Sequence, residues 1–122
     1  MNVTDAERQI MEVLWEKHPT SAEEIIKALA GTSNWRTGTI KALLNRMLKK
    51  GSVTATPQGR RYLYEPAISR RECIGKDSQR LLDRWFDGRL APLVAHLSNT
   101  DSLSGEQLAE LRQLIDELSD DD

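Results

Sequence analysis

The sequence predicts a mostly α-helical chain with one small β-hairpin, divided into two domains. Apolar residues recur every three or four positions over several long segments, which is the spacing of amphipathic helices. One stretch near the middle alternates between polar and apolar residues around turn-forming residues, and so predicts two short strands. The composition changes after Pro66, and we expect the domains to cover residues 1–67 and 68–122.

Three helices are predicted before the strands, and each has signals at its ends. Thr4 and Glu7 have the spacing of a capping box, in which each side chain binds the other residue's backbone amide. Ser21 can cap the second helix, and Gly51 is the residue type that commonly follows a helix C-terminus. The helices are expected at about residues 4–17, 22–30 and 37–50.

The predicted strands follow the third helix directly. Residues 52–56 and 61–65 alternate as strands do, and residues 57–60 (Pro-Gln-Gly-Arg) have turn chemistry. Three helices followed by a hairpin is the plan of a winged helix-turn-helix domain. The sequence therefore predicts this fold for residues 1–67.

The second domain is predicted to be helical and to pair with a second copy. Ser69 can cap a long helix that Gly88 and Pro92 interrupt, and a last helix covers about residues 104–118. These ~50 residues carry more large apolar side chains than they can bury alone. Isologous packing in a homodimer would cover them, and the alternative is that they fold back onto the first domain. The residues expected at the dimer interface are Leu81, Trp85, Phe86, Leu93, Val94, Leu97, Leu108, Leu111, Ile115 and Leu118.

Charge is distributed unevenly along the chain, and this points to nucleic acid. The net charge is −2, yet residues 34–64 carry seven basic and no acidic side chains. These cations fall on the third helix and the hairpin, and such a local basic surface suits a phosphate backbone. Double-stranded DNA is favoured over RNA, because an RNA major groove is too narrow for a helix. The alternative is a protein-interaction module whose basic face binds an acidic protein.

Individual roles follow from residue type and place. Thr39 lies at the N-terminal end of the third helix, where a hydroxyl and a methyl group can contact base edges. The basic residues and one tyrosine suit phosphate oxygens, which position a protein without reading sequence. The predicted backbone contacts are Lys41, Arg46, Lys49, Lys50, Arg60, Arg61 and Tyr62.

Several other classes of function find no support in the sequence. The single Cys73 excludes an internal disulfide and a cysteine-based zinc finger. There is no nucleophile elbow, HExxH motif or glycine-rich phosphate loop, so we expect no enzyme activity, metal or cofactor. No apolar run approaches the ~20 residues of a membrane helix, and the N-terminus does not read as a secretory signal. We therefore expect a cytoplasmic protein.

Several segments together resemble one known family. They are TDAERQIMEVLWE, TSAEEIIKAL, WRTGTIKALLNRMLKKG, RRYLYEP, FDGRLAPLVAHL and LSGEQLAELRQLIDEL, and they extend over almost the whole chain. The chain thereby resembles the penicillinase repressor (BlaI/MecI) family of winged-helix repressors. The resemblance implies a homodimeric repressor of a palindromic operator with TACA/TGTA-like half-sites, and β-lactam resistance genes are candidate targets.

The resemblance also assigns positions. It places the family's base-reading threonine on Thr39 and a backbone-contacting basic residue on Lys41. Gly38 and Ala42 depart from the lysine and threonine of the staphylococcal-type members, which puts the half-site preference in question. In the family's β-lactam systems a membrane sensor-protease signals a cut at an Asn-Phe bond. The matching pair here is His96-Leu97, so control by cleavage stays open.

Overall fold

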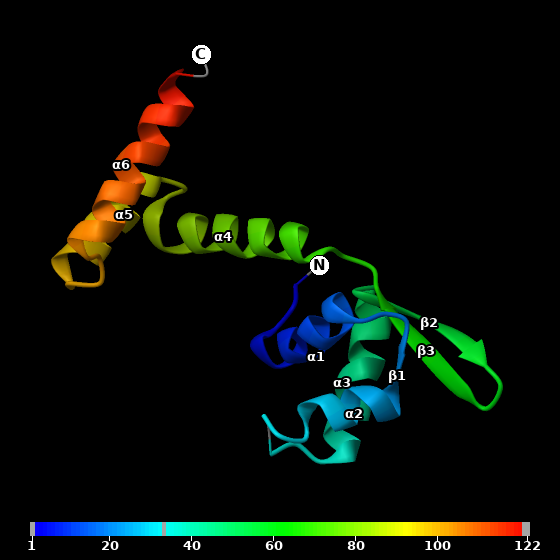
Figure 1. The fold of residues 1–122 in the computed structure, drawn as a ribbon. Helices are drawn as coiled ribbons and strands as arrows, with labels where there is room; N and C mark the ends of the chain where they lie inside the picture. The colour runs from blue at the N-terminus through cyan, green and yellow to red at the C-terminus, as the bar shows by residue number, and fades with distance from the viewer. Residues whose placement is uncertain (1, 33, 121–122) are drawn as a thin grey trace. The chain divides into compact units, whose positions relative to one another are not determined.

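The computed structural model describes residues 2–32 and 34–120, and these form two compact units, Met1–Lys76 and Asp77–Asp122 (Figure 1). Helices dominate, with a small antiparallel sheet in the first unit. The first unit contains α1 (Asp5–Glu16), β1 (Thr20–Ser21), α2 (Ala22–Leu29), α3 (Thr37–Lys50), β2 (Val53–Gln58) and β3 (Arg61–Pro66). The helix α4 (Arg70–Phe86) begins there, and α5 (Leu90–Asn99) and α6 (Gly105–Asp120) follow in the second unit.

The first three helices lie where the sequence predicts them, because their end signals act as expected. The Thr4 hydroxyl accepts from the Glu7 amide at 3.2 Å, and the Glu7 carboxylate accepts from the Thr4 amide at 2.9 Å. The Ser21 hydroxyl accepts from the Glu24 amide at 3.3 Å. At the end of α3, Gly51 takes the left-handed conformation with φ 85° and donates its amide to the helix.

The sheet has three strands in the order β1-β3-β2, one more than the sequence predicts. The additional strand, β1, is two residues long and pairs Thr20 with Tyr64. The hairpin turn is also tighter than expected, because Pro57 lies within β2 opposite Tyr62. A proline fits there since β2 is an edge strand, and Gly59 takes φ 64° in the two-residue turn.

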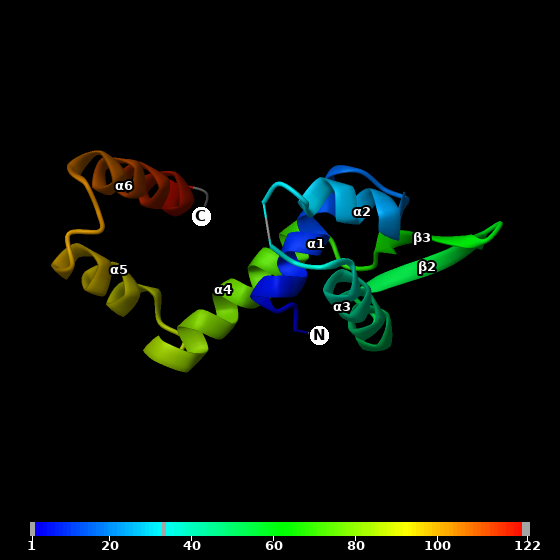
Figure 2. The ribbon, with the colours of Figure 1, turned by 90° about the horizontal axis from the view of Figure 1, so that it is seen from below.

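The hydrophobic core of the first unit lies among the three helices, the base of the sheet and the start of α4. The hairpin of β2 and β3 projects away from the helices (Figure 2). The Trp15 indole packs against the core and donates to the Ile68 carbonyl at 2.9 Å. The fully buried apolar side chains of this core are Ile10, Met11, Leu14, Ile25, Ile40, Leu44, Met47 and Val53.

The compact units divide within α4, beyond the expected domain boundary at residue 67. Ile68 and Cys73 are 4% and 5% exposed and belong to the core of the first unit. The start of α4, which contains Cys73, therefore belongs to the first unit. The Ser69 hydroxyl caps this helix by accepting from the Glu72 amide at 3.1 Å. The assignment of residues 1–67 to DNA binding and 68–122 to dimerisation stays a prediction.

The expected interruption of the long helix occurs at residues Asp87 and Gly88. Both have positive φ, 50° and 76°, and the Gly88 amide bonds to the Leu82 carbonyl at 2.9 Å. Pro92 does not add to the break, because it lies in the first turn of α5. Backbone amides in the first turn of a helix have no carbonyl acceptor within that helix, so the amide hydrogen that proline lacks is not missed. No helix in the described part of the chain is long and apolar enough to span a membrane.

Candidate nucleic-acid interface

The helix α3 presents a fully exposed face along its length. The N-cap residue of α3, Arg36, makes no capping hydrogen bond with its side chain. Thr39, in the first turn, is exposed. A Cβ atom added to Gly38 would meet nothing within 4 Å, and Ala42 one turn later is exposed as well. This end of the helix is therefore small, open and able to approach another surface closely.

Three basic side chains of α3 extend to solvent. Lys41 and Lys49 are exposed, and among the described residues no carboxylate lies within ion-pair distance of either. The Arg46 side chain is 61% exposed, with its Nε 4.0 Å from a carboxylate oxygen of Glu7. These charges are available to an anionic partner.

Lys50 lies differently from the other cations of α3. Its Nζ is 2.8 Å and 3.0 Å from the two carboxylate oxygens of Glu7 and 3.1 Å from the Asn2 carbonyl. We expected a phosphate contact from Lys50, but its ammonium already has three acceptors within the unit. Because an ammonium has three donors, a phosphate would have to displace one of these bonds.

The hairpin adds a second basic element. Arg60 lies in the turn, and Arg61 pairs across it with Gln58, whose side-chain oxygen accepts from Nη2 at 3.4 Å. Tyr62 is 55% exposed, so its hydroxyl is free to reach a partner. All three residues predicted for the hairpin are thus at its surface.

A hollow of about 280 Å³ separates α3 from the hairpin and the start of α2. Lys41, Arg61 and Tyr62 all line it, so the structure brings together predicted residues from two elements. Asn45, which is not among the predicted DNA contacts, also lines this hollow. The available signal was its spacing, since Asn45 lies four residues after Lys41 on the same side of the helix.

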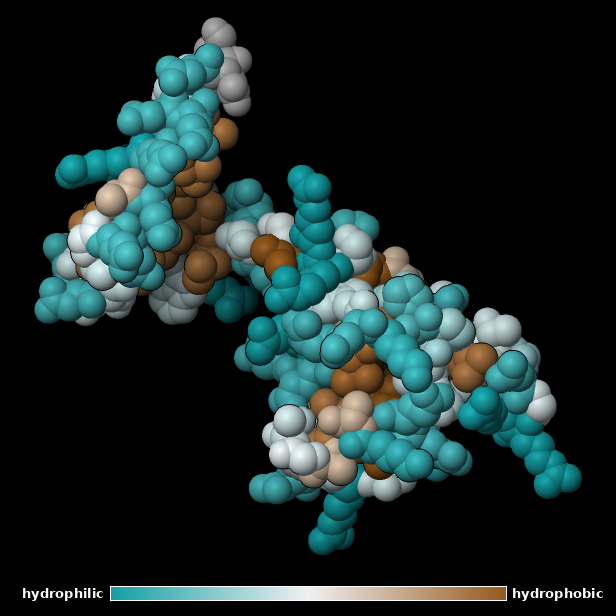
Figure 3. Space-filling model, viewed as in Figure 1, coloured by the Kyte–Doolittle hydropathy of each residue, from teal (hydrophilic) through white to brown (hydrophobic). Residues whose placement is uncertain are grey.

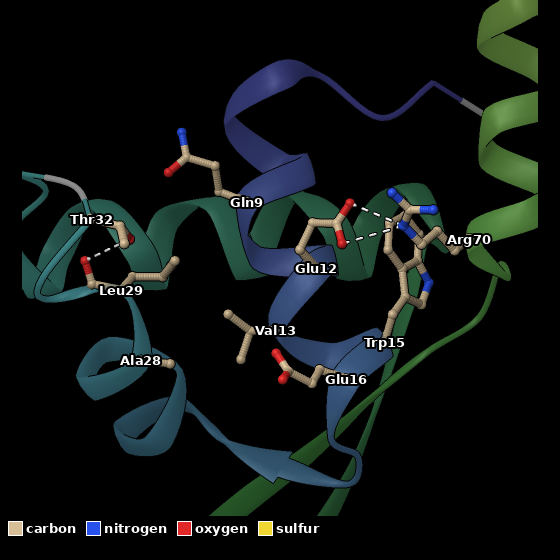
Figure 4. A pocket seen from close by; sticks show the side chains of 9 residues that line it. All are labelled: Gln9, Glu12, Val13, Trp15, Glu16, Ala28, Leu29, Thr32 and Arg70. Atoms are coloured by element: carbon tan, nitrogen blue, oxygen red, sulfur yellow. Dashed lines mark hydrogen bonds and ion pairs between the residues drawn. The ribbon is translucent and has the colours of Figure 1, made fainter.

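A larger hollow, of about 610 Å³, lies on the other helices of this unit (Figure 4). Val13 and Leu29 belong to its apolar lining, and Glu12 at its edge pairs with Arg70 at 3.3 Å. None of the residues predicted to contact DNA lines it. Within residues 2–32 and 34–120, no three His, Cys, Asp or Glu side chains gather as metal ligands would.

The second unit leaves its apolar side chains largely uncovered. Neither α5 nor α6 contains a buried residue, and apolar side chains are visible along both helices (Figure 3). Trp85 is 69% exposed and Leu118 61%. Leu90 and Leu114 are also exposed, although they were not among the predicted interface residues. The predicted residues that are half-buried are Phe86, Leu93, Val94, Leu97, Leu108 and Leu111, and those that are exposed are Leu81, Trp85, Ile115 and Leu118.

The peptide bond between His96 and Leu97 lies in the last part of α5. The His96 carbonyl accepts from the Thr100 amide at 3.2 Å, and the Leu97 carbonyl accepts from the Ser102 amide at 2.9 Å. The His96 ring also lies 6.3 Å from the ring of Phe86, centroid to centroid. A protease could reach this bond only after local opening of the helix.

Comparison with known proteins finds one family that matches nearly the whole chain. The sequence model of the penicillinase repressor family matches residues 3–117. The penicillinase repressor of Bacillus licheniformis is 36% identical over 115 residues, which cover 94% of this chain and 90% of that protein. The methicillin resistance regulatory protein MecI of Staphylococcus aureus strain N315 is 25% identical over 113 residues, which cover 93% and 92%.

Solved structures match more than half of the chain and confirm the predicted winged-helix fold. The solution structure of B. licheniformis BlaI, in monomeric form in complex with the blaP half-operator, has a TM-score of 0.53 and 35% identity, and the match covers 59% of this chain and 88% of that one. The solution structure of the DNA-binding domain of the repressor BlaI has the same TM-score, with 34% identity and coverage of 59% and 93%.

Proposed function

Because the chain belongs to the penicillinase repressor family, we propose that it is a DNA-binding transcriptional repressor that acts as a homodimer in the cytoplasm. Its operator is a palindrome with TACA/TGTA-like half-sites, and its targets are β-lactam resistance genes. One observation carries the proposal: the open end of α3 and the basic hairpin lie in a unit similar to one solved on a half-operator.

The exposed side chains of the first unit suggest how the DNA is bound. Thr39 reads a base edge, since it lies at the open N-terminal end of α3 beside Gly38. The other contacts go to phosphates and fix the register of the protein on the duplex. They come from Lys41, Arg46 and Lys49 on α3, and from Arg60, Arg61 and Tyr62 on the hairpin. Lys50 leaves this set because of its bonds to Glu7.

The homodimer is supported by the second unit. An isolated chain would expose Trp85 and Leu118 together with the other apolar residues of α4 to α6. Burial of apolar surface stabilises association by roughly 25 cal/mol per Å². A two-fold dimer would cover these side chains and would also present two copies of α3 to the two halves of a palindrome.

The family resemblance also suggests a membrane sensor-protease as a partner, acting at His96-Leu97. Both carbonyls of this pair are hydrogen-bonded at the end of α5. Cleavage there would follow opening of the last turn, so it would be faster in conditions that loosen the second unit.

The proposal is tested by fluorescence anisotropy with a labelled palindrome and a scrambled duplex of the same composition. At physiological salt, about 150 mM, we expect at least ~10³-fold tighter binding to the palindrome. Affinity should also fall by ~10³–10⁵ between about 50 and 200 mM salt, as expected for 6–10 phosphate contacts. Equal affinity for both duplexes would show that the protein is not a sequence-specific repressor.

A further inference from the structure

The carboxylate of Glu7 is the one charged group that the first unit buries completely among the described residues, with 0% of the side chain exposed. It accepts hydrogen bonds from the Thr4 amide and from Lys50, the latter at 2.8 Å and 3.0 Å. Burial by itself would raise the pKa of Glu7, but the Lys50 and Thr4 hydrogen bonds and the Lys50 charge outweigh it, so the pKa is lowered. Glu7 is therefore ionised at neutral pH.

Lys50 closes a bridge from α3 to the start of the chain. Its Nζ bonds to Glu7 at the start of α1 and to the Asn2 carbonyl before that helix. The Lys50 side chain is only 32% exposed, and its charge is balanced by the carboxylate. The C-terminal end of α3 is thus fixed to α1, and one positive charge is withdrawn from the exposed surface.

Arg46 lies one helical turn before Lys50 and faces the same carboxylate. Its Nε is 4.0 Å from Glu7 Oε2, while 61% of the side chain is exposed. A guanidinium has five N–H donors in a planar fork, so an edge directed to Glu7 leaves other donors for a second anion. Thr39 lies seven residues before Arg46 and hence on the same flank of α3.

We propose that Glu7 is a positioning residue for operator recognition, resting on the function proposed above. It acts through Arg46, whose guanidinium it orients toward a DNA phosphate beside the bases that Thr39 reads. It also removes Lys50 from phosphate binding, so that the cations on this flank of α3 contact DNA in one arrangement. Glu7 itself does not touch the DNA, because its side chain is buried.

The proposal is tested with a double-mutant cycle in the full-length chain. Glu7→Gln keeps the size of the side chain and removes its charge, and Arg46→Met removes the guanidinium. We expect Glu7→Gln to weaken operator binding about fivefold more in the natural background than in one where Arg46 is already Met. The same change in Lys50 occurs in both backgrounds, so it cancels from the comparison.

A matched control uses Lys49, an exposed cation of α3 with no carboxylate nearby among the described residues. Lys49→Met should weaken binding as well, but its effect should multiply with that of Glu7→Gln. A purely structural role for Glu7 would give the same fold-change in all three backgrounds and would overturn the proposal. Circular dichroism melting of each variant shows separately whether the fold is retained.

A second variant covers the case in which Glu7→Gln does not fold. Arg46→Lys keeps the charge at an exposed position but replaces the fork by a single ammonium, which cannot face Glu7 and a phosphate in the same way. We expect it to lose about as much operator affinity as Arg46→Met. Full affinity in Arg46→Lys would overturn the inference, whereas failure of the unaltered protein to prefer the palindrome would overturn the proposed function instead.

Discussion

The two units of this chain differ in what they bury by themselves. Every buried apolar side chain among the described residues lies between Val3 and Cys73. In the second unit α5 and α6 bury none, although large apolar residues are nearly as frequent there, 9 of 26 residues, as in α1 to α3, 13 of 34 residues. The first unit thus has a buried core of its own, whereas α5 and α6 leave all their apolar side chains at least partly exposed.

The difference separates two sources of stability. A domain with its own core unfolds with a free energy that does not depend on protein concentration, whereas an interface between copies does depend on it. The first unit is therefore expected to keep its fold in a monomer. The second unit is expected to be stabilised by association, and DNA affinity would then depend on residues outside the proposed DNA contacts.

The largest effect is expected from a charge placed in the proposed interface. Leu111→Asp would put a carboxylate among the apolar side chains of α6, and we expect monomers in size-exclusion chromatography with light scattering. Operator affinity should fall at least ~100-fold, because the second half-site is no longer bound by a linked partner. Ala109→Asp adds the same charge to an exposed position of α6 and should leave the dimer intact. An Leu111→Asp monomer that binds the operator tightly would contradict the dimer model.

A cavity in the core of the first unit should lower the free energy of unfolding but leave the dimer intact. Leu44 lies on α3 in the core of the first unit and is 1% exposed. Leu44→Ala is expected to lower the free energy of unfolding by about 2–5 kcal/mol. Urea unfolding of the first unit measures this loss, while light scattering should still report dimers. Loss of dimers in Leu44→Ala would mean that the two units do not fold independently.

The same comparison explains what could be predicted from the sequence. Helix bounds in both units were predictable because capping residues and helix-ending glycines are local signals, as Thr4 with Glu7 and Gly51 illustrate. The strand β1 was missed because two residues are too few for an alternating pattern. Its pairing with Tyr64 depends on contacts across the fold.

The site was predictable in composition but not in every role. The seven cations of residues 34–64 read alike in the sequence. Lys50 differs only because the fold brings Glu7, 43 residues away in the sequence, to within 2.8 Å of its ammonium. Asn45 joined the site for the converse reason: an uncharged residue adds nothing to a count of charges, yet it lines the hollow beside Lys41.

Base reading in the first unit should depend on one side chain. Thr39→Ala removes the hydroxyl and methyl contact at the open end of α3. We expect it to reduce discrimination at one half-site position by ~1–3 kcal/mol while binding to scrambled DNA is unchanged. Competition assays with single-base operator variants measure this. Thr37→Ala, in the first turn of the same helix, is the control and should retain the original base preference. Equal discrimination in Thr39→Ala and the unaltered protein would exclude Thr39 from base reading.

Acid should weaken the first unit through Glu7. Because the pKa of Glu7 is lowered in the folded protein, the unfolded chain binds the proton more readily. The contribution of ionised Glu7 to the free energy of unfolding is complete above the ordinary glutamate pKa of about 4.3. It is lost as the pH falls through the lower pKa that Glu7 has in the folded protein. Urea unfolding at neutral and at acidic pH should therefore show a larger loss in the natural protein than in Glu7→Gln. An identical loss in both proteins would show that Glu7 does not contribute to the acid sensitivity. The pKa of Glu24 is also lowered, by its hydrogen bonds to Lys17 and Ser21, but Glu24 is present in both proteins and its effect cancels from the comparison.

The smallest effect is expected from a single cation of the hairpin. Arg60 is exposed in the turn and contributes nothing to the core, so Arg60→Ala should leave the melting temperature unchanged. Loss of one phosphate contact should weaken operator and scrambled duplex about equally and lower the salt slope by about 0.9 per protomer. Lys27→Ala on α2, away from the proposed interface, controls for the change in net charge. A selective loss of operator binding in Arg60→Ala would instead assign the hairpin a part in reading sequence, and α3 would no longer account for specificity alone.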